Sequence, residues 1–391
     1  MSETAVRRAD TDPRGRPAAG LSPEATRRAA DTALQDARDA RAHRRLTGGT
    51  VAALEAAGFA RHFVPQRWGG SEGTFSEVFR AAVTVGEGCA SAAWCAVLWA
   101  AHARFAALLP EQGQKEIWGA GPDVRIAAAI VPPAGSSVRV TGGRLLHGEW
   151  SLASGIDHAD WVLLAAPETD APGRPARVFA VPKSAVRVHD TWNSTGLRAT
   201  GSNTVSLAET VVPDSRSAPL AALLNGDGQE GLARCYSAPA HLAGGLMFCA
   251  PALGAARRAL ATWNEWARTA APGGARPLDR PSVQERLVRS AAEIEAVELM
   301  LCEAARRADG DPVTAEAVAR NQRDAAVAVD WLAAAVDRLF RTGGAHVRDA
   351  DGDLHRHWAD VLTVASHGAL RLEPAAEAYA RSLGGSGADD A

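Results

Sequence analysis

Apolar and polar positions follow a helical rhythm at both ends of the chain and a strand-like rhythm in its middle. From Ser22 to about Trp118 the spacing is helical, and Ser22-Pro23 reads as an N-cap followed by proline at the first helical position. The stretch SAAWCAVLWAAHARFAALL is apolar almost all round and predicts a buried helix. Helical periodicity returns over residues 240–382. Its apolar rows are typical of helices packed nearly antiparallel in a bundle: Leu287, Ile294 and Leu301, then Val329, Leu332, Val336 and Leu339.

Between about Val124 and Val212 the chain breaks into short β-rich runs separated by proline and glycine, with a hairpin turn expected at Thr141-Gly142-Gly143-Arg144. This pattern predicts a compact antiparallel sheet domain. The expected fold class is therefore α+β and mostly α. We expect a disordered leader over 1–21, a helical domain over 22–120, a β domain over 121–222 and a helical bundle over 223–385.

Composition excludes several classes of partner. The 391 residues carry 42 Lys+Arg against 45 Asp+Glu, a net charge of −3, so there is no basic field for nucleic acid. No apolar run approaches the roughly 18 residues that a membrane span needs, and the first twenty residues lack the apolar core of a signal peptide. The five cysteines show no Cys-x-x-Cys pairing, which fits a reducing compartment. We therefore expect a cytoplasmic protein with no membrane partner.

The segment GEWSLASGIDHADW places unusually small residues where a strand would carry branched ones. After Trp150 come Ala153, Ser154 and Gly155, before the apolar run that begins at Trp161. Small side chains let another group approach the backbone closely. The pattern predicts that something flat lies against this part of the chain.

Five motifs, in this order along the chain, resemble the acyl-CoA dehydrogenase fold: an N-terminal helical domain, a central antiparallel β domain and a C-terminal four-helix bundle. Nearly the whole chain after the leader can be laid on that fold. The motifs are FVPQRWGG, GEWSLASGIDHADW, DTWNSTGLRATGSNTV, ARPLDRPSVQERL and LFRTGGAHVRDADGDLHRHWADV.

The resemblance implies a flavin site, and the flat object would be the isoalloxazine ring. Ser154 falls where this family places a strand hydroxyl at the flavin N5 edge. Trp150, in the same motif, and Ser202, in the motif DTWNSTGLRATGSNTV, would also contact the flavin. Arg276 and the Gly343-Gly344 turn offer a guanidinium and backbone N–H groups for the flavin phosphate. In this family the Gly-Gly motif serves the cofactor of an adjacent subunit, so the resemblance also implies a homotetramer. The alternatives are that Ser154 bonds its own backbone and that Arg276 is a solvated charge.

The acyl-CoA dehydrogenase reaction itself is disfavoured, because both positions of that family's catalytic glutamate are empty. At the first of these positions the sequence has His367-Gly368. The second position falls within residues 231–264, which contain no Asp or Glu. Removing an α-proton from a thioester requires a positioned base.

His367 and His102 instead match two histidines of the two-component flavin monooxygenases of this fold, the group containing the oxygenase of 4-hydroxyphenylacetate hydroxylase. Those enzymes take reduced FMN or FAD from a separate NAD(P)H:flavin reductase and form a C4a-hydroperoxyflavin with O₂. They then hydroxylate an aromatic substrate. By this resemblance Ser154 and His367 serve the hydroperoxide, His102 orients or deprotonates a phenolic or polyketide-type substrate, and Trp94 walls the substrate pocket. Antibiotic biosynthesis is suggested only by association with the high Ala, Arg and Gly content.

Other interpretations remain open from sequence. Either histidine can be a satisfied structural residue in an Ala-rich helix, and Trp94 can belong to the core. His355 and His357 do not share a helix face, and no cluster completes a site around them, so no metal is expected. Two rival functions are an acyl-CoA dehydrogenase or oxidase-like flavoenzyme with an unrecognised base, and a non-catalytic flavin-fold binding protein.

Overall fold

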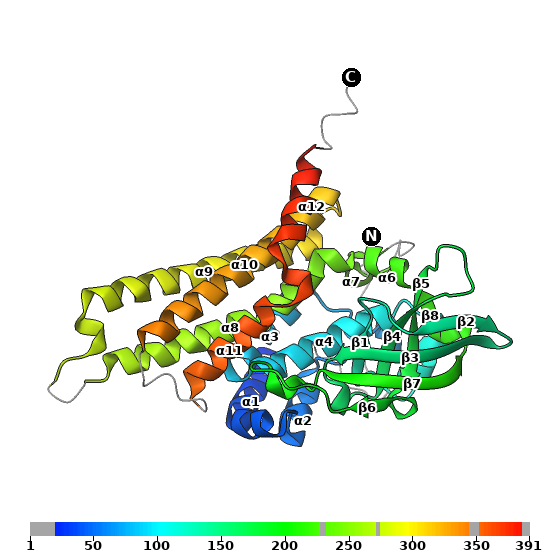
Figure 1. The fold of residues 1–391 in the computed structure, drawn as a ribbon, viewed down its shortest axis with the longest axis horizontal. Helices are drawn as coiled ribbons and strands as arrows, with labels where there is room; N and C mark the ends of the chain where they lie inside the picture. The colour runs from blue at the N-terminus through cyan, green and yellow to red at the C-terminus, as the bar shows by residue number, and fades with distance from the viewer. Residues whose placement is uncertain (1–19, 227–231, 271–273, 344–351, 385–391) are drawn as a thin grey trace, which may run out of the picture.

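The computed structural model describes residues 20–226, 232–270, 274–343 and 352–384. N-terminal helices lie between a β-strand region and a long helical bundle, which extends to the opposite side of the molecule (Figure 1). The chain therefore has the predicted order of helices, strands and helices. Residues 1–19 of the predicted leader lie outside the described part.

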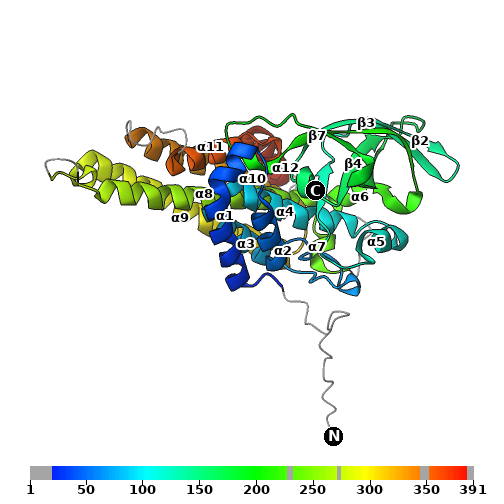
Figure 2. The same ribbon diagram turned by 90° about the horizontal axis from the view of Figure 1, so that it is seen from below.

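The N-terminal region is built around one helix, α4 (Ala90–Ala106), that is buried on all sides. Ser22 caps the first helix by accepting a hydrogen bond from the Ala25 amide at 3.1 Å, as its sequence predicts. Every residue of α4 is buried, which confirms the buried helix expected there. The helices of this region are α1 (Pro23–His43), α2 (Gly48–Ala57), α3 (Phe75–Gly88), α4 (Ala90–Ala106) and α5 (Glu111–Trp118). Figure 2 shows α1, α2 and α3 on the face of the molecule seen from below.

The strands form two four-stranded sheets, with orders β1-β4-β5-β8 and β2-β3-β7-β6. The hairpin expected at 141–144 joins β2 to β3, where Val140 pairs with Gly143. All described strand pairs are antiparallel except β1 with β4, a parallel pair that the strand pattern did not predict. The strands are β1 (Ile126–Ala129), β2 (Ser136–Val140), β3 (Gly143–Ala153), β4 (Trp161–Pro167), β5 (Ala176–Pro182), β6 (Arg187–His189), β7 (Asn203–Val212) and β8 (Ser217–Pro219).

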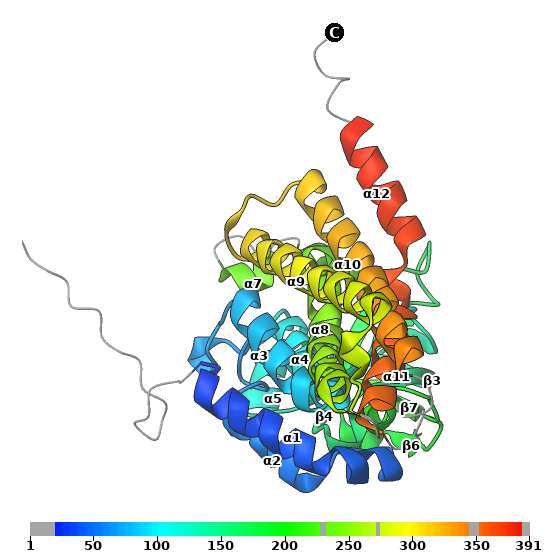
Figure 3. The ribbon, with the colours of Figure 1, turned by 90° about the vertical axis from the view of Figure 1, so that its left-hand side faces the viewer.

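Four long helices form the bundle: α8 (Ala240–Arg268), α9 (Pro281–Gly310), α10 (Ala315–Thr342) and α11 (Asp353–Ala365). Figure 3 views them nearly end-on. The apolar row of α10 is buried as predicted, and in α9 Ile294 and Leu301 are buried while Leu287 is partly so. Short helices α6 (Leu220–Asn225) and α7 (Arg234–Ser237) precede the bundle, and α12 (Leu372–Gly384) follows it, standing out from the body beside α10. Among the helices described, none is both long and apolar enough to cross a bilayer.

The bundle is joined to the N-terminal region by a close crossing of α3 and α8. A Cβ added at Gly254 would overlap the carbonyl oxygen of Val83, and one at Gly86 would lie 3.0 Å from the carbonyl oxygen of Pro251. Close packing makes such a clash costly. The two glycines therefore allow the backbones of α3 and α8 to approach each other closely.

Candidate active site

A row of three hydroxyl groups crosses from the end of β3 to the turn before β7. The Ser154 and Ser202 hydroxyl oxygens lie 2.8 Å apart, and those of Ser202 and Thr200 lie 2.7 Å apart. Thr200 donates in turn to the backbone carbonyl of Leu197 at 2.9 Å. All three side chains are buried. Ser154 therefore bonds to neighbouring side chains rather than to its own backbone, contrary to the structural alternative raised from its sequence.

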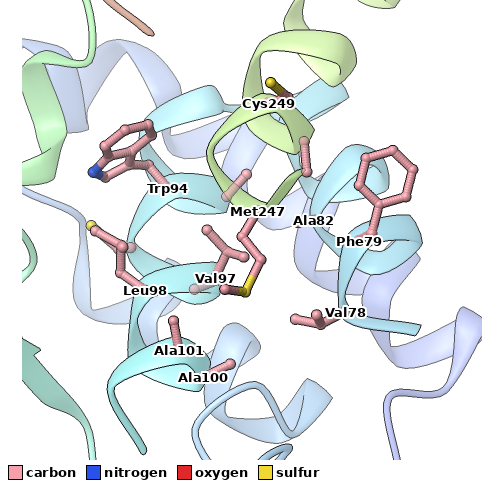
Figure 4. Packing of buried hydrophobic residues seen from close by; sticks show 14 of the residues in the cluster. Val78, Phe79, Ala82, Trp94, Val97, Leu98, Ala100, Ala101, Met247 and Cys249 are labelled. Atoms are coloured by element: carbon pink, nitrogen blue, oxygen red, sulfur yellow. The ribbon is translucent and has the colours of Figure 1, made fainter. Parts of the chain in front are cut away.

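An aromatic cluster adjoins this row through Trp94 of α4. The Trp94 indole N–H donates to the Ser154 hydroxyl oxygen at 3.1 Å. Its ring stacks on Phe248 of α8 with 5.3 Å between centroids, and His367 lies 4.3 Å from Phe248 and 5.5 Å from Trp94. In Figure 4, Trp94 and Leu98 project from the side of α4 away from α3, while Val97 points toward Met247. The structure thus brings Trp94, Ser154 and His367 together from three distant segments.

The His367 ring is held as a hydrogen-bond donor. Its Nδ1 accepts a hydrogen bond from the Ala369 amide at 3.2 Å, because His367 caps the 3₁₀ turn Gly368–Leu370. An accepting Nδ1 carries no proton, so the neutral ring has its proton on Nε2. Burial lowers the pKa of His367, which favours the neutral ring near pH 7.

His102 is held in the opposite tautomer. Its Nδ1 lies 2.8 Å from the carbonyl oxygen of Ile126, the first residue of β1, and a carbonyl can only accept. Nδ1 must therefore carry the proton, which leaves Nε2 with a lone pair. Burial lowers the pKa of His102 to about 4, so the ring is neutral at pH 7. His102 lies two helical turns beyond Trp94 on α4 and makes no ring contact with the aromatic cluster in the structure described.

An open groove of about 370 Å³ lies beside the hydroxyl row, between β3, β7 and the segment that precedes β7. Its volume is within the range of small-molecule and cofactor sites. Leu152 presents an exposed apolar side chain to it, with 62% of its surface accessible and a φ of 63°. The lining residues are Ser151, Leu152, Thr191, Trp192, Asn193, Ser194, Ser202 and Thr204. A flat ring with polar edges fits such a mixed apolar and hydroxyl surface.

The segment below the groove is anchored to the bundle by α11. The Asp360 carboxylate accepts a hydrogen bond from the Leu197 amide at 2.6 Å, and burial raises the pKa of Asp360. A Cβ added at Gly196 would overlap the carbonyl oxygen of Ala359. This contact explains why glycine precedes Leu197. The hydrogen bond ties the hydroxyl row to a bundle residue 163 positions away in sequence.

Several residues expected to bind the cofactor do not line the groove of the same chain. Trp150 is buried in the core between the sheets, where its indole N–H donates to the Ala165 carbonyl at 2.8 Å, and it does not line the groove. Arg276, in the α8–α9 connection, is exposed and forms a 2.9 Å ion pair with Asp279. The end of α8, the start of α9 and the α10 end capped by Gly343 lie in the part of the bundle remote from the strands (Figure 1). Gly344 lies outside the described residues.

Sequence reasoning missed Phe248, Thr200, Trp192 and Leu152. Phe248 lies within the stretch that lacks acidic residues, which indicated only a missing base. Thr200 and Trp192 lie in the motif DTWNSTGLRATGSNTV, of which only Ser202 was a candidate. Leu152 could be singled out only by its left-handed backbone, which sequence does not reveal.

Comparison with known proteins agrees with this geometry. Residues 246–372 match the family "Acyl-CoA dehydrogenase, C-terminal domain". The chain is 33% identical over 341 residues to the flavin-dependent monooxygenase, oxygenase subunit HsaA, of Mycobacterium tuberculosis, covering 83% of this chain and 86% of that protein. It is 30% identical over 364 residues to the FADH₂-dependent resorcinol hydroxylase, oxygenase component, of Rhizobium sp., covering 86% and 88%.

A solved structure with the same fold is XiaF from Streptomyces sp. in complex with FADH₂ and glycerol. It is 28% identical, with a TM-score of 0.85 over 93% of this chain and 94% of XiaF. The fold is thus the acyl-CoA dehydrogenase fold in the form used by monooxygenases, and the chain belongs to the family of flavin-dependent monooxygenase oxygenase subunits.

Proposed function

We propose that this protein uses reduced flavin and O₂ to hydroxylate an aromatic small molecule of phenolic or polyketide type. The observation that carries the proposal is a pair of neutral histidines held in opposite tautomers: the partly buried His367 presents a proton, and the buried His102 presents a lone pair. Hydroxylation of a phenol needs both, because a donor must serve the activated oxygen while a base takes the phenolic proton. The relatives named above are oxygenase components, one of them a resorcinol hydroxylase.

The groove beside Ser202 would hold the flavin ring, with Leu152 and Trp192 offering apolar surface and hydroxyls offering polar contacts. Ser154 would meet its N5 edge. Reduced flavin, once bound, would supply the two electrons that activate O₂, so that one oxygen atom of O₂ is transferred to the substrate and the other leaves as water. FMN and FAD both remain candidates, and the reduced form would come from a separate NAD(P)H:flavin reductase.

The two histidines would have different roles, and only His367 belongs to the aromatic cluster. His367, beside Trp94 and Phe248, would donate its Nε2 proton toward the oxygen bound next to the ring. His102 would accept the substrate's phenolic proton on Nε2 while its own Nδ1 stays bonded to Ile126. Trp94 would wall the substrate pocket. An acyl-CoA dehydrogenase role is less well supported, because His367-Gly368 stands where that reaction needs a carboxylate.

The assembly would be a cytoplasmic homotetramer. Arg276 is exposed and does not line the groove, and neither does Gly343, so Arg276 and the Gly343-Gly344 turn would instead serve the flavin phosphate of a neighbour. Large exposed apolar side chains on the bundle and on α12 would be covered in such an assembly. They are Val288, Leu299, Trp331, Leu372 and Leu383.

Two matched variants test the division of roles. His367→Asn can keep an acceptor for the Ala369 amide but removes the Nε2 donor. His102→Asn can keep a donor to Ile126 but removes the Nε2 base. The purified protein is mixed with reduced flavin under anaerobic conditions. The complex is then mixed rapidly with O₂ and each of a panel of phenols, and hydroxylated product and H₂O₂ are measured.

We expect His367→Asn to release more H₂O₂ at unchanged substrate affinity. His102→Asn should consume reduced flavin normally while hydroxylation falls about 10²-fold or more, the usual worth of a general base. If both variants hydroxylate like the wild type, the two-histidine assignment is wrong. If the wild type oxidises acyl-CoA thioesters and no phenol, the dehydrogenase alternative replaces it.

A further inference from the structure

The direction of every hydrogen bond in the hydroxyl row can be read from its anchored end. The Leu197 carbonyl oxygen can only accept, so the Thr200 hydroxyl donates its single proton to it. Ser202 must then donate to Thr200, and Ser154 must donate to Ser202. Trp94, whose indole N–H can only donate, fixes the other end. All the protons of the row therefore point away from Ser154 and toward Leu197.

This direction determines what Ser154 can offer to a bound molecule. Its one proton is engaged by Ser202, and one lone pair is engaged by Trp94. The remaining lone pair has no partner among the residues described. Ser154 thus faces a ligand as a hydrogen-bond acceptor, whereas its sequence alone allows either role.

A hydrogen-bond acceptor at the position of Ser154 would bind the reduced and oxidised forms of a flavin differently. Reduced flavin carries a hydrogen on N5 and can donate it, whereas N5 of oxidised flavin has a lone pair and no hydrogen. Two lone pairs facing each other leave a buried polar group unsatisfied, which is costly. We infer that Thr200 and Ser202 act as positioning residues that orient the Ser154 hydroxyl so that the site selects reduced over oxidised flavin. This inference rests on the proposed function, which puts Ser154 at the N5 edge.

The anchor of the relay is itself rigid. Leu197 sits in a left-handed conformation with a φ of 50°, and its amide is held by the buried carboxylate of Asp360. Its carbonyl also accepts from the Thr200 amide at 3.1 Å. Because the acceptor cannot turn away, the proton direction is set before any ligand arrives, which avoids reorganisation on binding.

Thr200→Val tests the relay, because valine keeps the shape of threonine and removes only its hydroxyl. Ser202 then loses its acceptor and can turn its proton to Ser154, whose own proton is freed toward the groove. Anaerobic equilibrium titrations with FMN and FAD, each oxidised and reduced, give the ratio of the two dissociation constants. We expect the preference for reduced flavin to fall by about five- to tenfold, the worth of one neutral hydrogen bond.

Thr200→Ser keeps the hydroxyl and should keep the wild-type ratio. Thr210→Val removes a hydroxyl that bonds the Ala208 carbonyl elsewhere in the β region, and it should also keep that ratio. Should Thr200→Val fail to fold, Ser202→Ala removes the next member of the row and is expected to cause the same loss.

The outcomes separate the relay from the flavin site. A wild type that prefers reduced flavin, together with a Thr200→Val protein of equal preference, would overturn the relay and leave the proposed function standing. A wild type that binds neither form would overturn the proposed function as well. Loss of preference in Thr200→Val with recovery in Thr200→Ser supports the inference.

Discussion

Replacing His102 by asparagine should change how the stability of the protein depends on pH. In the folded protein burial lowers the pKa of His102 to about 4 from an ordinary value of 6.5. The unfolded chain therefore takes up a proton more readily as the pH falls, and acid favours unfolding. The contribution is fully present above pH 6.5 and is lost as the pH falls toward 4.

The magnitude follows from that difference in pKa. A lowering from 6.5 to about 4 corresponds to about 3 kcal/mol in total. About 2 kcal/mol of it should be lost between about pH 7.5 and about pH 5, since the folded ring begins to titrate only near the lower limit. The asparagine side chain has no group that titrates in this range, so the His102→Asn variant lacks this loss.

Urea unfolding of both proteins, followed by tryptophan fluorescence across this pH range, gives the comparison. The other buried histidines, such as His62 and His357, are present in both proteins, so the difference between the two curves isolates His102. A constant offset would reflect only the smaller side chain and its altered packing. If the two free energies of unfolding stay parallel from about pH 7.5 to about pH 5, His102 is not held neutral by burial, and the argument for its role as a base fails.

Two further predictions concern the frame around the site. Gly196→Ala should move the Leu197 segment away from α11, because the added methyl overlaps the Ala359 carbonyl; flavin affinity should fall at least about tenfold in anaerobic titrations, and unchanged affinity would contradict the anchoring role. Light scattering at micromolar concentration should give a tetramer, and Arg276→Ala should weaken binding of FMN or FAD without changing that mass. A stable monomer that binds flavin fully would refute the shared site.

Much of the architecture could be predicted from local patterns. The N-cap at Ser22, the all-apolar helix around Trp94 and the hairpin at 141–144 follow from side-chain periodicity and turn chemistry, which act within a few residues. The parallel pairing of β1 with β4 could not be read in this way. It depends on which strand edges meet after a long connection, and no local signal records that.

For the site, the amino-acid sequence by itself determined which chemical groups are available: His367 in place of a carboxylate base, His102 on the apolar helix, a serine among small residues, and hydroxyls in the turn before β7. Only the tertiary structure decided what those groups can do. The tautomers depend on carbonyl and amide partners such as Ile126 and Ala369, and the acceptor role of Ser154 depends on a row that ends at Leu197. A proton's position is set by the partner across the hydrogen bond, and for His102 and Ser154 that partner comes from a distant part of the chain.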